Sequence, residues 1–271
     1  MEKIKFEEEW NELCPIYLEN DNNFFQIGTG VLIDIFDSIY LLTAAHIIDE
    51  YYKSHLGHLL IPSENSFIPI SGIINHKHLK NNETREDDKI DFSFFKLDDK
   101  TIRALHSIFK PLKPHQIRFN YDYTSNMTDI IKKEILTYRH PKNSSKELKN
   151  IHLIDDKENI ISMNNYLIKN MIIFAGYPNT KSKTHQNIHT SEIVYYWGGS
   201  VHKKTYEQYN CNTQIQILSE FGKHKALDSN FDLRIPPKPF GISGGGIYKI
   251  IRKNNSFDRE LIGIAHTYKK K

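Results

Sequence analysis

Short segments rich in β-branched and aromatic residues recur through most of this chain, and turn-forming residues separate them. The clearest pair is residues 24–35 and 39–45, which flank a turn-like stretch at residues 34–38. Two such segments joined by a short turn favour an antiparallel hairpin. Gly28 and Gly30 in the first segment indicate a bulge or a sharp bend, as expected where strands curl. The pattern as a whole favours an all-β fold, either a sandwich or a barrel.

Further predicted strands lie on both sides of a polar middle region. The candidates are residues 58–62, 67–75, 90–97, 170–178, 191–197, 213–218, 246–251 and 260–266. The middle region, residues 98–165, is rich in Lys and Asn and holds one candidate helix at 127–137, so we interpret it as a connection with an insertion. Apolar residues at i, i+4 and i+7 predict a short amphipathic helix over residues 3–13. Residues 1–97 then form an N-terminal segment and a first β-domain, and residues 166–271 form a second one.

The composition excludes several classes of function. Lys and Arg number 36 and Asp and Glu 33, a balance that gives no electrostatic reason to expect nucleic-acid binding. No apolar run approaches the roughly 18 residues that a membrane-spanning helix needs. The polar N-terminus has no apolar signal-peptide region. Cys14 and Cys211 are far apart and form no metal-ligand cluster, which favours free thiols in a reducing compartment. We therefore expect a cytoplasmic protein without a membrane span.

One glycine-rich stretch, Gly-Ile-Ser-Gly-Gly-Gly at residues 241–246, could carry chemistry. Glycine reaches backbone angles that other residues avoid and lets another group approach closely. Ser243 in such a turn could present its hydroxyl while nearby backbone N–H groups point at the same place. Acyl transfer needs this combination of a nucleophile and an oxyanion hole. A flexible glycine turn between two strands is the alternative interpretation.

Two further stretches could supply a base and an orienting acid. A predicted strand, Leu-Leu-Thr-Ala-Ala, ends on His46, and the segment Asp-Phe-Ser-Phe begins with Asp91. Taken singly, the histidine could be a structural residue and the aspartate a turn or cap residue. With Ser243 the order along the chain is His, Asp, Ser.

Together these motifs resemble those of the trypsin-like (chymotrypsin-fold) serine peptidases. The Thr-Ala-Ala-His segment that ends at His46 is similar to the family's histidine motif, and the segment at Asp91 to its aspartate motif. The Gly-Ile-Ser-Gly-Gly segment around Ser243 is similar to the nucleophile motif, and Gly-Tyr-Pro at 176–178 to a turn of the second barrel. The resemblance covers residues 24–97 and 166–268.

The resemblance implies two antiparallel six-stranded β-barrels with the active site in the cleft between them. His46 would be the general base, Asp91 its orienting partner and Ser243 the nucleophile. The backbone N–H groups of Gly241 and Ser243 would form the oxyanion hole. No cofactor and no metal is expected; the pair His76 and His78 is expected to face solvent.

Ile242 departs from the pattern of trypsin-type zymogens, in which an aspartate at this position pairs with a newly cut N-terminus. Activation by that route is therefore not expected, and the chain is more similar to bacterial intracellular and periplasmic members of the family. Six residues before Ser243, at the expected base of the substrate pocket, stands Pro237. Since no acid stands there, a trypsin-like preference for Lys or Arg is disfavoured.

The strand over residues 263–268 should form the wall of the substrate pocket and pair with an extended peptide. The residues expected to contact substrate, besides Pro237, are Ile264, Ala265, His266 and Tyr268. His266 stands where the family often has a small polar residue, and it is expected to contact Asp91 or to narrow the pocket.

The sequence thus predicts a serine endopeptidase that acts through an acyl-enzyme on a protein or peptide substrate, with a dedicated partner protein as a further expectation at the level of the family. Two alternatives keep the fold: an inactive protease-fold binding module, and an esterase that uses the same triad. The Gly-x-Ser-x-Gly pattern also fits an α/β-hydrolase. That fold places its acid and histidine after the serine, and too few residues follow Ser243 for it.

Overall fold

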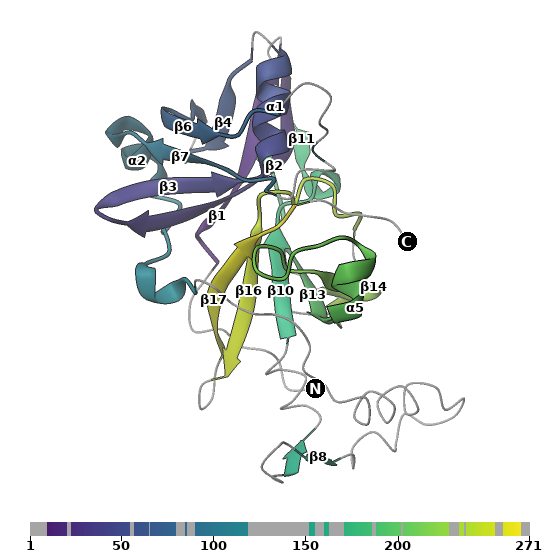
Figure 1. Cartoon of the computed structure of the whole chain (residues 1–271). Helices are drawn as coiled ribbons and strands as arrows, with labels where there is room; N and C mark the ends of the chain where they lie inside the picture. The colour runs from purple at the N-terminus through teal and green to yellow at the C-terminus, as the bar shows by residue number, and fades with distance from the viewer. Residues whose placement is uncertain are drawn as a thin grey trace.

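A computed structural model describes two antiparallel β-sheets packed against each other (Figure 1). The described residues are 10–20, 23–54, 57–64, 66–79, 85, 90–118, 152–154, 160–162, 171–185, 188–201, 203–227, 233–235, 237–252 and 257–266. Strands are the main secondary structure in this part of the chain, which confirms the predicted all-β class in its coarse form.

The first sheet holds seven strands in the order β5-β4-β1-β2-β3-β7-β6. Their bounds are β1 Leu13–Asn20, β2 Asn23–Ile35, β3 Ser38–Thr43, β4 Leu59–Pro62, β5 Phe67–Pro69, β6 Gly72–His76 and β7 Ser93–Leu97. Helix α1, Ala45–Ser54, follows β3, and helix α2, Asp99–Leu105, follows β7. A 3-10 turn, η1 (Pro114–Gln116), follows on the way to the second sheet.

The predicted hairpin of β2 and β3 is confirmed. The strands pair from Ile35↔Ser38 to Val31↔Leu42. Phe36 and Asp37 connect them with positive φ angles of 53° and 55°, the backbone of a two-residue turn whose twist matches that of the strands. The sheet bends further at a bulge in β2, where Ile27 is the extra residue between the pairs Ile16↔Gly28 and Tyr17↔Gln26.

The second sheet holds six strands in the order β15-β14-β13-β10-β16-β17. Their bounds are β10 Met171–Gly176, β13 Val194–Ser200, β14 Ser219–Leu227, β15 Leu233–Arg234, β16 Gly246–Arg252 and β17 Phe257–Ile264. The remaining described elements are β8 His152–Ile154, β9 Ile160–Ser162, η3 Asn179–Lys181, β11 Lys183–His185, β12 Ile188–Thr190 and α5 Lys203–Gln208. β8 pairs with β9, and β11 pairs with β12. None of the described helices is long and apolar enough to cross a membrane.

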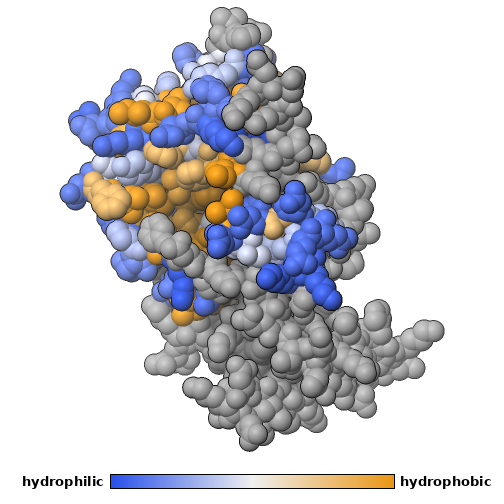
Figure 2. Space-filling view, in the orientation of Figure 1, coloured by the Kyte–Doolittle hydropathy of each residue, from blue (hydrophilic) through white to orange (hydrophobic). Residues whose placement is uncertain are grey.

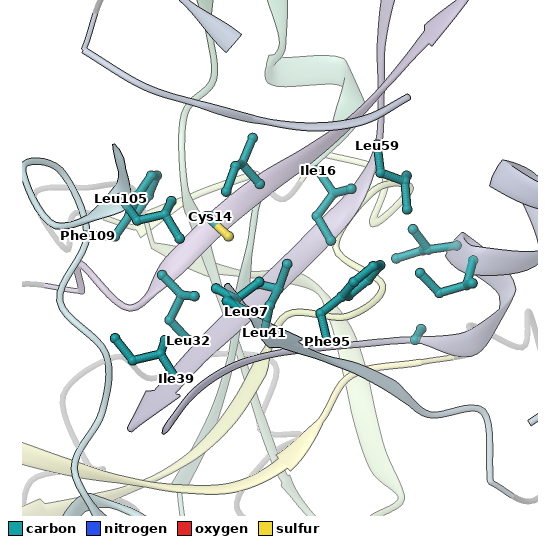
Figure 3. Close-up of a cluster of buried hydrophobic side chains, with 14 residues drawn as sticks. Cys14, Ile16, Leu32, Ile39, Leu41, Leu59, Phe95, Leu97, Leu105 and Phe109 are labelled. Carbon is teal, nitrogen blue, oxygen red and sulfur yellow. The ribbon is translucent and has the colours of Figure 1, made fainter. Parts of the chain in front are cut away.

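The first sheet curls around its own apolar core, which α1 and α2 help to close (Figure 3). Cys14, Ile16, Leu32, Leu41 and Phe95 lie in this core, almost fully buried. Cys14 and Cys211 are both free, as predicted, and burial raises the pKa of the Cys14 thiol to about 12.

A second apolar cluster joins the two sheets. It combines Leu13 and Val31 of the first sheet with Ile173, Tyr248 and Leu261 of the second. β3 contributes partly buried side chains to the same cluster, and Figure 2 shows apolar side chains gathered over β3 and the junction between the sheets. Burial of this surface is what fixes the two sheets against each other.

A buried ion pair lies at the edge of this cluster. Arg259 of β17 donates to both carboxylate oxygens of Glu12, at 3.1 Å from Nε and 2.8 Å from Nη2, and both side chains are almost completely buried. The Arg259 guanidinium also lies 4.2 Å from the centre of the Trp10 ring, a cation–π geometry. The pair and the ring tie the segment before β1 to the last strand of the second sheet.

Several sequence predictions differ from this structure. The helix over residues 3–13 is wrong at its described end, because Trp10 precedes a turn and Leu13 begins β1. Residues 213–218 form a turn and a connection, and the strand begins only at Ser219. The helices α2 and α5 were not predicted, and the candidate helix at 127–137 lies outside the described residues.

Candidate active site

His46 and Asp91 meet because the strands next to them are paired. Thr43, the last residue of β3, lies opposite Ser93, the first residue of β7. Since the strands are antiparallel, the residues that follow β3 and those that precede β7 leave the sheet at the same edge. His46 is the second residue of α1, and Asp91 lies two residues before β7. The register alone thus brings them together.

Asp91 holds His46 through two hydrogen bonds. The His46 Nδ1 atom lies 2.6 Å from Asp91 Oδ2, and the His46 backbone N–H donates to Asp91 Oδ1 at 2.9 Å. A carboxylate only accepts hydrogen bonds, so this contact places a proton on Nδ1 and leaves Nε2 as the acceptor of a neutral imidazole. Asp91 is 1% exposed at its side chain and His46 31%, so the pair joins a buried anchor to an accessible ring.

Two opposing effects set the pKa of Asp91. Burial disfavours the charged carboxylate and raises its pKa, whereas the hydrogen bonds and the charge interaction with His46 favour the carboxylate. The second effect is stronger, so the pKa of Asp91 lies below its ordinary value. Asp91 is thus a carboxylate at neutral pH.

His266 is a second imidazole beside the same carboxylate. Its Nδ1 atom lies 3.9 Å from Asp91 Oδ2, too far for a hydrogen bond but close enough for a charge interaction that favours the ionised acid. The expected contact between His266 and Asp91 is therefore confirmed.

The Ser243 loop, residues 241–245, packs on the segment that leads to His46. The Thr29 backbone N–H of β2 donates to Ser243 O at 2.9 Å. Gly244 has a φ of +84°, and a Cβ there would lie 2.0 Å from Thr29 O and 3.1 Å from Ala44 N. Glycine is required at this position both by the angle and by the space. The loop therefore lies against β2 and against Ala44, two residues before His46.

The structure does not close the triad by a hydrogen bond. Among the described residues, Ser243 Oγ and His46 Nε2 make no hydrogen bond with each other or with another group. His46 and Asp91 are thus in direct contact, whereas the described contacts of the Ser243 loop on this side are with Thr29 of β2 and with Thr43 and Ala44, which precede His46.

Two backbone N–H groups of the loop are left with no acceptor within the described part of the chain: those of Gly241 and Ser243. The other three are bonded. Ile242 N–H donates to Pro239 O at 3.4 Å, Gly244 N–H to Ala265 O at 2.7 Å and Gly245 N–H to Ile242 O at 2.8 Å. Two unpaired donors separated by one residue could bind an anionic oxygen. They are the two residues whose N–H groups the sequence predicted as an oxyanion hole.

Thr29 is a residue of this site that sequence reasoning missed. Its hydroxyl accepts from the Tyr177 N–H at 2.9 Å and donates to Gly241 O at 2.9 Å, and its side chain is fully buried. Thr29 thus links β2, the turn after β10 and the Ser243 loop. The only signal in the sequence was its position between Gly28 and Gly30, which gives no indication of a polar role.

The remaining residues that were predicted to contact substrate make contacts within the protein that the sequence did not predict. The Ala265 N–H donates to Gly245 O at 2.7 Å, so both polar backbone groups of Ala265 serve the loop. Ile264 packs against the cluster between the sheets. Pro237 O accepts from the Tyr196 hydroxyl at 3.4 Å. Tyr268 lies outside the described residues.

Ile242 occupies an apolar environment. Its side chain packs against Val194, Tyr196 and Ala226 of the second sheet. The position therefore stabilises the loop by burial and offers no partner for a charged N-terminus.

The prediction that His76 faces solvent is wrong. Its side chain is 2% exposed, its Nε2 lies 3.0 Å from Asp49 Oδ1 and its Nδ1 lies 2.7 Å from Ser93 Oγ. Arg85 pairs with the same Asp49 carboxylate. Burial lowers the pKa of His76, although Asp49 opposes the effect. Among the described residues, no group of three or more side chains is arranged to hold a metal ion.

Comparison with known proteins assigns the chain to no family. No protein-family model matches the sequence, and no curated protein matches it either.

Proposed function

We propose that the protein is a serine hydrolase of the trypsin-like type that cleaves peptide bonds. The observation that supports this best is the combination of a carboxylate-held histidine with a nearby serine loop that carries two unpaired N–H groups. His46 and Asp91 supply the first part, and the residues from Gly241 to Ser243 supply the second. Each part taken alone could have a purely structural role, but acyl transfer requires both parts in one place.

The proposed reaction begins when Ser243 Oγ attacks the carbonyl carbon of the scissile peptide. His46 Nε2 takes the hydroxyl proton while the carbonyl oxygen becomes negatively charged and accepts the N–H groups of Gly241 and Ser243. Asp91 stabilises the imidazolium formed on His46. The C–N bond then breaks, and His46 gives its proton to the leaving amine. Water attacks the resulting ester by the same steps and frees Ser243.

The two sheets correspond, in this proposal, to two β-barrels with the reacting groups at their junction. His46 and Asp91 belong to the first sheet, whereas the Ser243 loop precedes β16 of the second. Curling of the first sheet and the apolar cluster between the sheets support this arrangement. A cytoplasmic location and a protein substrate remain part of the proposal.

Labelling with a fluorophosphonate probe tests the proposal. This reagent phosphonylates an activated serine, so the wild-type protein should be labelled, and both Ser243→Ala and His46→Ala should abolish labelling. Ser93→Ala is a matched control, because Ser93 is a buried serine bonded to a different histidine, His76. A folded wild-type protein that stays unlabelled at high probe concentration would refute the proposal.

A second candidate function is an inactive protease-fold module that binds a partner. The missing hydrogen bond between Ser243 Oγ and His46 Nε2 favours it. The same probe separates the two candidates, since the module would not react. If labelling occurs, cleavage of a peptide library as against simple esters then distinguishes a peptidase from an esterase.

A further inference from the structure

The two unpaired N–H groups of the Ser243 loop point where they do because the carbonyl groups of the same peptides are held. In a planar trans peptide, the C=O and the following N–H point in opposite directions. Ile242 O accepts the Gly245 N–H at 2.8 Å, which fixes the direction of the Ser243 N–H. Phe240 O accepts the Asn179 N–H at 2.8 Å, which fixes the direction of the Gly241 N–H.

The two hydrogen bonds that hold these carbonyl groups come from different parts of the chain. Gly245 belongs to the loop itself, so the Ser243 N–H is set locally. Asn179 belongs to another segment, the short 3-10 turn η3 that follows β10. The direction of the Gly241 N–H therefore depends on a contact between two parts of the chain. It is also the more easily changed, because glycine permits the backbone rotation that would turn this peptide over.

The contact between Asn179 and Gly241 is close. Gly241 has a φ of +91°, and a Cβ at this residue would lie 1.6 Å from Asn179 Oδ1 and 2.7 Å from the Asn179 backbone N. On its other side, the Gly241 carbonyl accepts from the Thr29 hydroxyl. The Gly241 residue is thus held at its preceding peptide by Asn179 and at its following peptide by Thr29.

We infer that Asn179 is a positioning residue that acts through its backbone N–H: it holds the Phe240–Gly241 peptide with the Gly241 N–H available to the oxyanion. This inference rests on the proposed function and adds the residue that fixes the direction of one oxyanion-hole N–H before substrate binds. Without the bond to Phe240 O, the peptide could turn and the site would lose one of its two donors. Ser243 and His46 would remain in place, so the loss would be specific to transition-state stabilisation.

The backbone at Asn179 allows this donor to be removed without disrupting the turn. Proline has no N–H, and it is well tolerated at the first position of a helical turn. The preceding residue, Pro178, has φ −71° and ψ 138°, the extended conformation that a following proline requires. Asn179→Pro therefore deletes the donor, and its ring carbon also occupies the space next to Phe240 O. Asn179→Ala is the matched control, because it removes the side chain and keeps the N–H.

The experiment measures kcat and KM for p-nitrophenyl acetate, together with the rate of labelling by a fluorophosphonate. We expect Asn179→Pro to lower kcat and the labelling rate on the order of 100-fold, as removal of one oxyanion donor does, with little change in KM. Asn179→Ala should stay within about 3-fold of the wild type, since it keeps both donors. The unfolding midpoint of each variant reports whether the fold is intact.

The outcomes separate the inference from the proposed function. If the wild type is labelled and Asn179→Pro is labelled equally fast, the inference is wrong and the proposed function stands. If the wild type is not labelled at all, the proposed function is wrong, and the inference falls with it. Should Asn179→Pro fail to fold, the α-hydroxy acid analogue of asparagine at position 179 replaces the amide by an ester and removes the same donor without a ring. Wild-type rates in that variant would equally overturn the inference.

Discussion

Replacing Thr29 by valine should destabilise the fold although the two side chains have nearly the same shape. The Thr29 hydroxyl accepts from the Tyr177 N–H and donates to Gly241 O, each at 2.9 Å. Valine puts a methyl group at this position, so it removes both bonds and leaves two partly buried backbone groups without this partner. Each such group costs about 1–3 kcal/mol when it cannot reach water. The extra apolar surface of valine offsets only part of this, about 0.8 kcal/mol for one carbon.

Together these effects predict a loss of roughly 1–5 kcal/mol in the free energy of unfolding for Thr29→Val. Thr29→Ser keeps the hydroxyl and loses one methyl group, so it should cost only about 1 kcal/mol. Serine, the smaller and more polar residue, should therefore give the more stable protein at a fully buried site. Burial alone would predict the opposite order.

Urea unfolding followed by tryptophan fluorescence measures both variants against the wild type. Equal slopes against urea concentration would show that the midpoints report stability and not a change in the unfolded state. If Thr29→Val is as stable as the wild type, or more stable than Thr29→Ser, then the hydroxyl does not join β2 to the Ser243 loop in the way described.

Two further predictions follow from the buried charges. Because the pKa of Asp91 is held below its ordinary value of 3.8, its charged form stabilises the folded state above that value, and this contribution is lost as the pH falls through the lowered pKa. The stability difference between the wild type and Asp91→Asn, measured by urea unfolding, should thus be constant near neutral pH and shrink below about pH 4; a difference that stays the same down to pH 3 would contradict this. Glu12→Ala leaves the Arg259 guanidinium buried without the Glu12 carboxylate, so it should lower the free energy of unfolding by about 3–5 kcal/mol. Lys113→Ala breaks the more exposed pair of Lys113 and Asp34, so it should lower the free energy of unfolding by less than about 1 kcal/mol. Similar losses for both pairs in urea unfolding would show that burial does not set the cost.

The parts of the fold that the sequence predicted are those governed by local pattern. The β2–β3 hairpin follows from two β-branched segments around a two-residue turn. The position of Asp91 beside His46 was expected only from the family resemblance of their motifs, because the pairing of β3 with β7 that explains it was not predicted. The order of the three motifs led to the same residues. In each case a short stretch of sequence carries its own signal.

The parts that could not be predicted depend on contacts between distant segments. Trp10 and Leu13 have helical spacing, yet pairing with β2 draws Leu13 into a strand, because tertiary pairing overrides a short periodic pattern. Thr29 acts through its hydroxyl and Asn179 through a backbone N–H, and a backbone group has no residue type that would identify it. The burial of His76 likewise comes from Asp49 on another element.

The contact between Thr29 and Gly241 joins residues 212 positions apart in the sequence. The Ser243 loop also needs Ala265, whose carbonyl accepts the Gly244 N–H. Translation proceeds from the N-terminus at roughly 5–20 residues per second, so the first sheet can form many seconds before the loop has its supports. During that interval His46 and Asp91 can already be paired, but the Ser243 loop does not yet have the contacts that position it. The Ser243 loop can therefore make all of its described contacts only after residue 265 has emerged from the ribosome.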